Sequence, residues 1–209
     1  MKLSEVAKIT AGHPFRGRIV HTEDSVVVAL QLKDVQPQKG INWDSCTPTS
    51  LAGKKSPNWL QEGDILVAAK GSQNYAVLVD GTLLKAKKQA VAAPHFFIVR
   101  TKNNLVLPGY LAWLLNQQPC QKHFEQGAEG TLAKSIRRSV LENAPIMVPP
   151  IEDQHAIIGL STAMSNEQQL AEQLLRNSKK IMTAIALDLY SQEAKSGNHT
   201  STNKNSAKA

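Results

Sequence analysis

The distribution of apolar residues along the chain changes at the proline pair Pro149-Pro150. Before this pair, short apolar runs alternate with turns rich in glycine and proline, which is typical of a globular domain of strands and helices. After it, a helical pattern continues to about Gln192 without another proline, and a polar tail without apolar anchors follows. The pattern predicts an α/β (α+β) globular domain, a long helix and a disordered tail over residues 1–150, 151–192 and 193–209.

The apolar runs before the proline pair predict the elements of the domain. Runs rich in β-branched residues predict buried strands over Ser25–Leu32, Ile65–Ala69, Tyr75–Val79 and Ala90–Thr101. Apolar residues at helical spacing predict helices over Leu3–Gly12, 107–118 and 120–126, and a short one that contains Val140 and Leu141. One more apolar strand is expected directly before the proline pair, and Trp113 and Phe124 are expected in the core.

The segment after the proline pair carries a heptad repeat. Counting from Ile157, seven of the nine a and d positions are apolar, and the exceptions are Glu167 and Ser178. About 40 residues of helix would be roughly 60 Å long, which is longer than a small domain is wide. We therefore expect a coiled-coil-forming helix that pairs with a helix of another chain, the alternative being a helix folded back over its own domain. The residues expected at this dimerisation seam are Ile157, Leu160, Met164, Ala171, Leu174, Ile181 and Ile185.

Positive charge and hydroxyl groups gather in a few loops of the domain. The densest group precedes Leu141, where three cations and two hydroxyl side chains fall within eight residues. Such a loop suits contacts with phosphates and with guanine edges, whereas Ser135 could instead cap the short helix that follows. A Gly-Arg loop, a two-lysine patch and a Lys-Gly-Ser bend are weaker candidates, because each could be a solvated turn. The candidate DNA-binding residues are Arg16, Arg18, Lys54, Lys55, Lys70, Ser72, Thr131, Lys134, Ser135, Arg137 and Arg138.

Composition restricts the partner and the compartment only loosely. The formal net charge is +7, of which residues 196–209 contribute two, and a remaining surplus of +5 allows a polyanionic partner without requiring one. Cys46 and Cys120 form no CxxC pair, so we expect two partly buried thiols in a reducing compartment. The sequence has no signal peptide or apolar run of membrane-spanning length, and we expect a cytoplasmic protein without a membrane partner.

No catalytic motif can be found in the sequence. The six histidines include no HExxH pair and no Cys/His cluster, so no metal site is expected. GxSxG, Walker and GxGxxG motifs are absent as well, and the paired carboxylates are adjacent in sequence and therefore point in different directions. We predict a non-catalytic protein without a cofactor of its own. A nuclease built from scattered acidic residues and lysines is the weakest alternative.

Three groups of residues resemble the specificity (S) subunit of type I restriction–modification systems. The segment NAPIMVPPIEDQHAI (Asn143–Ile157) is similar to the junction of that family between a target-recognition domain and a spacer helix. EGTLAKSIRRSVL (Glu129–Leu141) is similar to the basic loop that precedes the junction. The opening LSEVAKITAGHP and the strand and turn EGDILVAAKGS complete the resemblance, which follows the order of the family up to Gln192.

The resemblance implies a DNA-recognition domain that enters the major groove and a helix that pairs antiparallel with a second one. Members of the family carry two such domains and two helices, whereas this sequence has a single copy and looks like a half-subunit. The expected partners are therefore double-stranded DNA, a second copy or another half-subunit, the methyltransferase (M) subunits, which hold S-adenosylmethionine, and the restriction (R) subunit. The alternative is a protein-interaction adaptor, or a mimic of an S subunit, that binds the methyltransferase without reading DNA.

Overall fold

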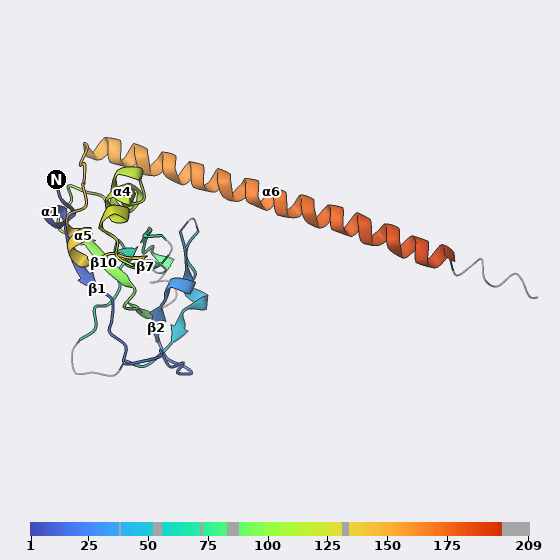
Figure 1. Ribbon diagram of the computed structural model, residues 1–209, viewed down its shortest axis with the longest axis horizontal. Coiled ribbons are helices and arrows are strands. Elements are labelled where there is room, and N and C mark those ends of the chain that lie inside the picture. The colour runs from blue at the N-terminus through green and yellow to red at the C-terminus, as the bar shows by residue number, and fades with distance from the viewer. Residues whose placement is uncertain (38, 52–55, 72, 83–87, 131–133, 198–209) are drawn as a thin grey trace, which may run out of the picture. The chain divides into compact units, whose positions relative to one another are not determined.

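The computed structural model describes residues 1–37, 39–51, 56–71, 73–82, 88–130 and 134–197, with side chains up to Ser191. The chain divides into two compact units, Met1–Ser161 and Thr162–Ala209. The first unit contains the strands and the shorter helices that the sequence predicts (Figure 1). The second continues helix α6, which runs from Ile151 to Gly197 and so begins inside the first unit.

A four-stranded antiparallel sheet forms the centre of the first unit. Its strands are β1 (Ala7–Ala11), β10 (Phe96–Thr101), β6 (Ile65–Ala68) and β8 (Ala76–Leu78), in this order. Every residue of β6 is buried, because alternate side chains belong to different cores: Ile65 and Val67 to one, Leu66 and Ala68 to the other. A strand covered on both faces has a continuous apolar sequence, as the run ILVA does.

Four short helices cover one face of this sheet. They are α1 (Leu3–Val6), α3 (Pro108–Leu115), α4 (Gln118–Gly127) and α5 (Arg138–Glu142). Their buried side chains, among them Leu111, Leu115 and Phe124, form the first core together with Ile65 and Val67. Pro108 and Pro119 stand in the first turns of α3 and α4, where the missing N–H costs no hydrogen bond.

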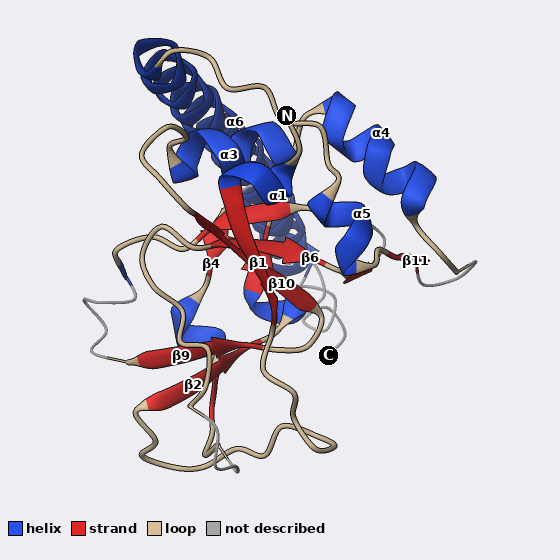
Figure 2. Cartoon of the chain, turned by 90° about the vertical axis from the view of Figure 1, so that its left-hand side faces the viewer, coloured by secondary structure: helices blue, strands red, loops and turns tan. Residues whose placement is uncertain are grey.

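A second, smaller sheet contributes to the other core. It pairs β5 (Thr47–Pro48), β2 (Val27–Leu30) and β9 (Gln89–Ala92) in this order, and β2 and β9 are parallel (Figure 2). Two further pairs of short strands complete the unit: β3 (Val35–Gln36) with β4 (Gly40–Ile41), and β7 (Lys70–Gly71) with β11 (Lys134–Ser135). Single turns of 3-10 helix cover Leu32–Asp34 and Trp43–Ser45.

The start of α6 is held in the first unit by a buried glutamine. Gln154 is fully buried, and its Oε1 accepts a hydrogen bond from the backbone N–H of Leu107 at 2.8 Å. Its Nε2 donates to the carbonyl oxygens of Leu105 (2.9 Å) and Pro149 (2.8 Å). Ile157 and Ile158 are half-buried against the first core. The dimerisation seam predicted from Ile157 onwards therefore begins with a residue that partly packs on its own domain.

Two of the predicted elements are wrong in their extent. The helix predicted over Leu3–Gly12 ends at Val6 and β1 follows, because Ala7 and Ile9 are buried while Lys8 between them is exposed, which is the alternation of a strand. The single strand predicted over Ala90–Thr101 is two strands, β9 and β10, that belong to different sheets. The segment around Pro94 separates them, since proline interrupts a ladder of hydrogen bonds.

Three local predictions are also corrected. The apolar segment before the proline pair forms no strand of its own, and only Pro145 makes an isolated bridge, with Lys2. Ser135 does not cap the short helix, because it lies in β11 and the N-cap position of α5 is Arg137. Lys70 and Gly71, predicted as a bend, form the short strand β7. Helix α6 extends beyond the predicted end at Gln192 to Gly197, and residues 198–209 lie outside the described part of the chain.

Candidate functional site

The basic loop and the Lys-Gly-Ser segment meet in space. β7 and β11 are antiparallel, with Lys70 opposite Ser135 and Gly71 opposite Lys134. The backbone N–H of Ile136 donates to the carbonyl oxygen of Ala69 at 3.0 Å, and the N–H of Ala69 donates to the carbonyl oxygen of His95 at 2.7 Å. Segments that lie far apart in the sequence are thus joined around the end of β6.

The basic loop is closed by backbone hydrogen bonds at its base. Glu129 and Ser135 exchange two N–H to C=O hydrogen bonds, both of 2.9 Å. Gly130 follows with φ of +101°, a conformation that glycine adopts without steric cost. The candidate residue Thr131 lies outside the described residues, as do Lys54, Lys55 and Ser72.

The cations of this region differ in how their charge is compensated. Arg137 forms a salt bridge to Glu129 (Nη2–Oε2, 2.8 Å) and Arg138 forms one to Glu142 (Nε–Oε1, 2.7 Å). Both pairs are largely exposed, so each contributes about 1 kcal/mol or less and can be exchanged for another anion. Within the described part of the chain, neither Lys70 nor Lys134 forms a salt bridge. These two exposed lysines can contact phosphate without breaking an existing pair.

The pairing also determines which side chains share a face of the two-stranded ribbon. Directly opposed residues of antiparallel strands point to the same face, so Lys70 and Ser135 lie together and Lys134 points to the other face beside Gly71. Gly71 adds no side chain there, which leaves room close to the backbone. A charge and a hydroxyl group on one face and a second charge on the other suit a ribbon that contacts two stretches of a phosphate backbone.

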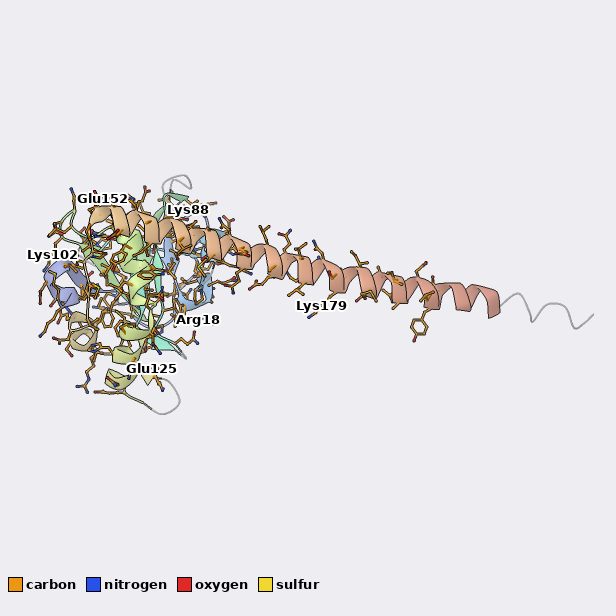
Figure 3. The ribbon with its side chains drawn as sticks, turned by 90° about the horizontal axis from the view of Figure 1, so that it is seen from above. Arg18, Lys88, Lys102, Glu125, Glu152 and Lys179 are labelled. Atoms are coloured by element: carbon orange, nitrogen blue, oxygen red, sulfur yellow. The ribbon has the colours of Figure 1, made fainter. Side chains whose placement is uncertain are left out.

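The two arginines of the Gly-Arg loop belong to a different part of the unit. Arg16 and Arg18 are exposed, and Figure 3 shows Arg18 at the surface. Their loop is held beside β5, because the hydroxyl of Thr49 donates to the carbonyl oxygen of Val20 and the N–H of Thr22 donates to that of Pro48, both at 2.9 Å. The Gly-Arg loop is thus hydrogen-bonded to the smaller sheet. Four of the other described candidates cluster at the end of β6, namely Lys70, Lys134, Ser135 and Arg137.

The buried ionisable groups have structural roles. Asp64 is almost completely buried and forms two hydrogen bonds to Arg100, from Nε to Oδ1 at 2.6 Å and from Nη2 to Oδ2 at 2.7 Å. The hydrogen bond to Asp64 raises the pKa of Arg100. Burial, followed by the charge of Asp34, raises the pKa of the Cys46 thiol to about 12, and burial raises that of Cys120 to about 11. Both cysteines are buried and unpaired, as predicted, and are poor nucleophiles at neutral pH.

The described residues contain neither a metal-binding cluster nor a membrane-spanning helix. Among them, no group of three His, Cys, Asp or Glu side chains could hold a metal ion. No helix in the same part of the chain is long and apolar enough to cross a membrane.

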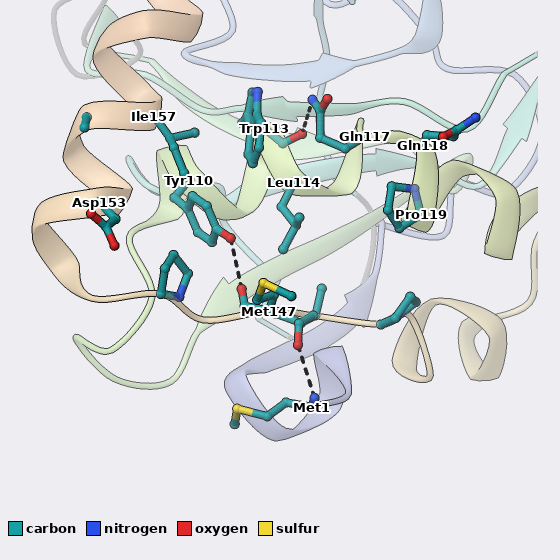
Figure 4. Close-up of a pocket in the computed structure, with 14 residues that line it drawn as sticks. Met1, Tyr110, Trp113, Leu114, Gln117, Gln118, Pro119, Met147, Asp153 and Ile157 are labelled. Carbon is teal, nitrogen blue, oxygen red and sulfur yellow. Dashed lines mark hydrogen bonds between the residues drawn. The ribbon is translucent and has the colours of Figure 1, made fainter.

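An apolar groove lies at the start of α6, and sequence reasoning missed it. Its cavity volume is about 840 Å³, and Tyr110 and Trp113 of α3, the segment around Met147 and the first turns of α6 line it (Figure 4). The hydroxyl of Tyr110 donates to the carbonyl oxygen of Met147 at 3.0 Å, which ties two of its walls together. Phe124 is buried as predicted, but Trp113 is only half-buried because it lines this groove.

Other residues that sequence reasoning missed are polar. Glu129 balances the charge of Arg137, and His95 supplies the backbone contact to Ala69. Glu129 opens the segment that resembles the basic loop of the family, but no local signal marks it as the partner of Arg137, and His95 stands in no motif. The sequence gives only a weak indication that Gln154 is buried. It lies in the first turns of α6 among polar residues, and a single amide there can turn inward and bind backbone groups.

The chain matches one family by sequence and several solved structures by fold. A family model described as "Type I restriction modification DNA specificity domain" matches residues 1–176. No curated protein matches the chain by sequence. Similar structures are the S subunit of a type-I restriction-modification system from M. genitalium (TM-score 0.57, 17% identity) and the HsdS subunit from Thermoanaerobacter tengcongensis (TM-score 0.54, 17% identity). A third is described as "Structural basis underlying complex assembly and conformational transition of the type I R-M system" (TM-score 0.51, 18% identity).

These structures are longer than the chain. The similarity covers 95% of this chain and 47% of the M. genitalium protein. It covers 81% of this chain and 37% and 38% of the other two. The chain therefore spans about half the length of the first of these proteins and less than half of the other two. At these sequence identities the similarity is one of fold.

Proposed function

The chain belongs to the family of type I restriction modification DNA specificity domains, and on this premise we propose that it reads one half of a bipartite DNA site. A second copy, paired through helix α6, would read the other half. The pair would recruit methyltransferase subunits, which would hold S-adenosylmethionine. Recognition, rather than catalysis, is the role of a specificity domain, and the chain needs no cofactor for it.

The observation that carries the DNA-binding part is the pairing of β7 with β11. This pairing holds Lys70, Ser135 and Lys134 on a short two-stranded ribbon, with Arg137 two residues beyond Ser135 along the chain. Charged side chains on a regular backbone can contact phosphates in a fixed register and leave neighbouring loops to read base edges. The basic surplus of the whole chain, +7 at neutral pH, is consistent with this partner.

The exposed seam of α6 supports the pairing part of the proposal. Leu160, Met164, Leu174 and Ile181 are each at least 60% exposed, although all are large apolar residues. Such an apolar stripe on a long helix is typical of a helix that pairs with another in a coiled coil. A dimer with two-fold symmetry would bind a DNA site with the same symmetry, which is an inverted repeat with a fixed gap.

The proposed DNA contacts can be tested by the salt dependence of binding. We expect Lys70→Ala and Lys134→Ala each to weaken binding of a random-sequence duplex. Each should also reduce the slope of log K against log salt by about one, because one phosphate contact is lost. Fluorescence anisotropy of a labelled duplex over a salt titration measures both quantities.

The matched control is Lys8→Ala, since Lys8 is an exposed lysine on the edge strand β1. Its slope should equal that of the unaltered chain. Slopes that fall equally for all three variants, or for none, would remove the β7–β11 ribbon from the interface. A chain that binds a purified methyltransferase subunit but no duplex, alone or in that complex, would instead be the protein-interaction adaptor.

A further inference from the structure

The turn between β9 and β10 lies beside the β7–β11 ribbon. Ala69 directly precedes β7 and connects the two. Its N–H donates to the carbonyl oxygen of His95 at 2.7 Å, and its carbonyl oxygen accepts the N–H of Ile136 at 3.0 Å. Ile136 in turn directly follows β11. His95 therefore stands next to the strand pair that carries Lys70 and Lys134, the lysines that we assign to DNA phosphates.

The backbone of this turn is anchored to both sheets. The N–H of Phe96 donates to the carbonyl oxygen of Ala93 at 3.1 Å, which closes the turn around His95. The N–H of Ala93 donates to the carbonyl oxygen of Leu30 in β2 at 2.8 Å, and Phe96 pairs with Ala68 of β6. The backbone of His95 is thus held from both sides.

The segment that follows β1 packs closely against the same turn. The N–H of Gly12 donates to the carbonyl oxygen of Phe96 at 2.9 Å, and the N–H of His13 donates to that of Ala92 at 2.7 Å. A Cβ atom at Gly12 would lie 2.1 Å from the carbonyl oxygen of Ala93, so no other residue fits there unless the backbone moves. Glycine at this position therefore allows a further segment to support the turn.

Two side chains of the turn reach the solvent. Ala93 and Phe96 are 2% and 0% exposed, whereas Pro94 and His95 between them are exposed. Proline has a fixed φ and no N–H, so Pro94 stiffens the turn and offers no polar contact through its side chain. In the part of the chain that the structure describes, the imidazole of His95 forms no hydrogen bond or salt bridge. It is therefore the polar side chain that the turn offers to a ligand.

An imidazole beside fixed cations suits the edge of a base better than a phosphate. It always carries at least one N–H donor, on a short side chain with a rigid ring. The charges of Lys70 and Lys134 favour a base edge made of acceptors, and in the major groove guanine presents two acceptors, N7 and O6. Adenine and cytosine present an amino donor there, and thymine has a methyl group beside its acceptor. Guanine is therefore the base that this surface fits.

We propose that His95 is a specificity-determining residue that donates a hydrogen bond from its imidazole to a guanine of the DNA site. The proposal rests on the DNA binding proposed above and deepens it, because it separates the residue that reads a base from the lysines that contact phosphates. Since the backbone of the turn is already held in place, little further ordering is needed to make the contact. His95 adds sequence preference without adding a phosphate contact.

The base contact can be tested on the preferred DNA sequence of the chain. Selection from a pool of duplexes with a randomised centre gives that sequence, with the full chain used alone and together with a purified methyltransferase subunit. Each G·C pair of the selected site is then replaced in turn by A·T. At one of these positions the unaltered chain should lose affinity roughly tenfold, and His95→Ala less than about twofold, because the variant has already lost the contact. Fluorescence anisotropy of labelled duplexes measures these affinities.

Two further variants separate a base contact from a structural effect. His95→Gln should shift the selected base at this position from guanine towards adenine, since a glutamine amide pairs with N6 and N7 of adenine. His155→Ala, at an exposed histidine of α6, is the matched control and should keep the guanine preference. The slope of log K against log salt should be the same for the variants and the unaltered chain, because the lysine–phosphate contacts remain.

The possible results lead to different conclusions. A guanine preference that His95→Ala loses and His155→Ala keeps, with an unchanged salt slope, supports the base contact. If either variant of His95 keeps the full preference, or if His155→Ala loses it as well, the base contact is overturned while the proposed DNA binding stands. A selected site without guanine, or a salt slope that falls in His95→Ala, has the same consequence. A chain that selects no sequence from the pool, alone or with the methyltransferase subunit, overturns both.

Discussion

The two units of this chain differ in where their apolar side chains lie. In Met1–Ser161 the large ones gather in two cores, and residues such as Leu111 and Phe124 are almost inaccessible to solvent. In the second unit, Leu174 and Ile181 are 67% and 60% exposed. Because burial of apolar surface is the main favourable term in folding, the first unit can supply its own stability, whereas we propose that the exposed helix gains its stability from a partner.

This difference suggests a division of roles between the units. The first unit carries the lysines that we assign to DNA, on a ribbon whose backbone hydrogen bonds depend only on that unit. The helix carries the seam that we assign to a second copy. Gln154 and the groove lie at the start of α6, and both belong to the first unit.

The largest expected effect is on the stability of the first unit. Phe124→Ala should lower its free energy of unfolding by about 3–5 kcal/mol, since it removes a buried ring and leaves a cavity. Urea denaturation followed by tryptophan fluorescence measures this, because Trp43, Trp59 and Trp113 all lie in that unit. Leu187→Ala on the exposed helix is the control and should change the transition by less than about 0.5 kcal/mol. Equal losses for both variants would contradict the contrast between the units.

A smaller effect is expected where the helix joins the domain. Gln154→Ala should lower the free energy of unfolding of the same unit by about 1–3 kcal/mol, because the N–H of Leu107 loses its acceptor inside the protein. The same fluorescence-detected urea transition measures the loss. Gln168→Ala, at an exposed glutamine further along α6, should be neutral. If both substitutions were neutral, the first turns of α6 would not be part of the domain's cooperative unit.

The sequence predicted those parts of the fold that have a strong local pattern. The buried run Ile65–Ala69 is a strand because both of its faces are covered, and α6 follows from an uninterrupted helical pattern after a proline pair. The helix predicted over Leu3–Gly12 is wrong in its second half. Leu3 and Val6 have helical spacing, but the pairing of β1 with β10, which a local pattern does not show, makes the rest a strand. The division of Ala90–Thr101 between two sheets is likewise a tertiary effect.

The sequence singles out candidate residues one by one but does not show how they are arranged. Lys70, Lys134 and Ser135 were singled out from their types and neighbours. Their pairing joins segments that are more than sixty residues apart, so no local pattern could reveal it. The groove was missed for the same reason, since its walls come from α3, the segment around Met147 and α6.

The association state of the full chain in solution tests the central claim most directly. Sedimentation of the unaltered protein should show a dimer, and Leu174→Asp with Ile181→Asp should sediment as a monomer, because two charges would enter the apolar seam. Tryptophan fluorescence of the variant should still show a folded first unit. A variant that remains dimeric, or an unaltered chain that is monomeric at every concentration, would contradict the pairing of α6 with a second copy.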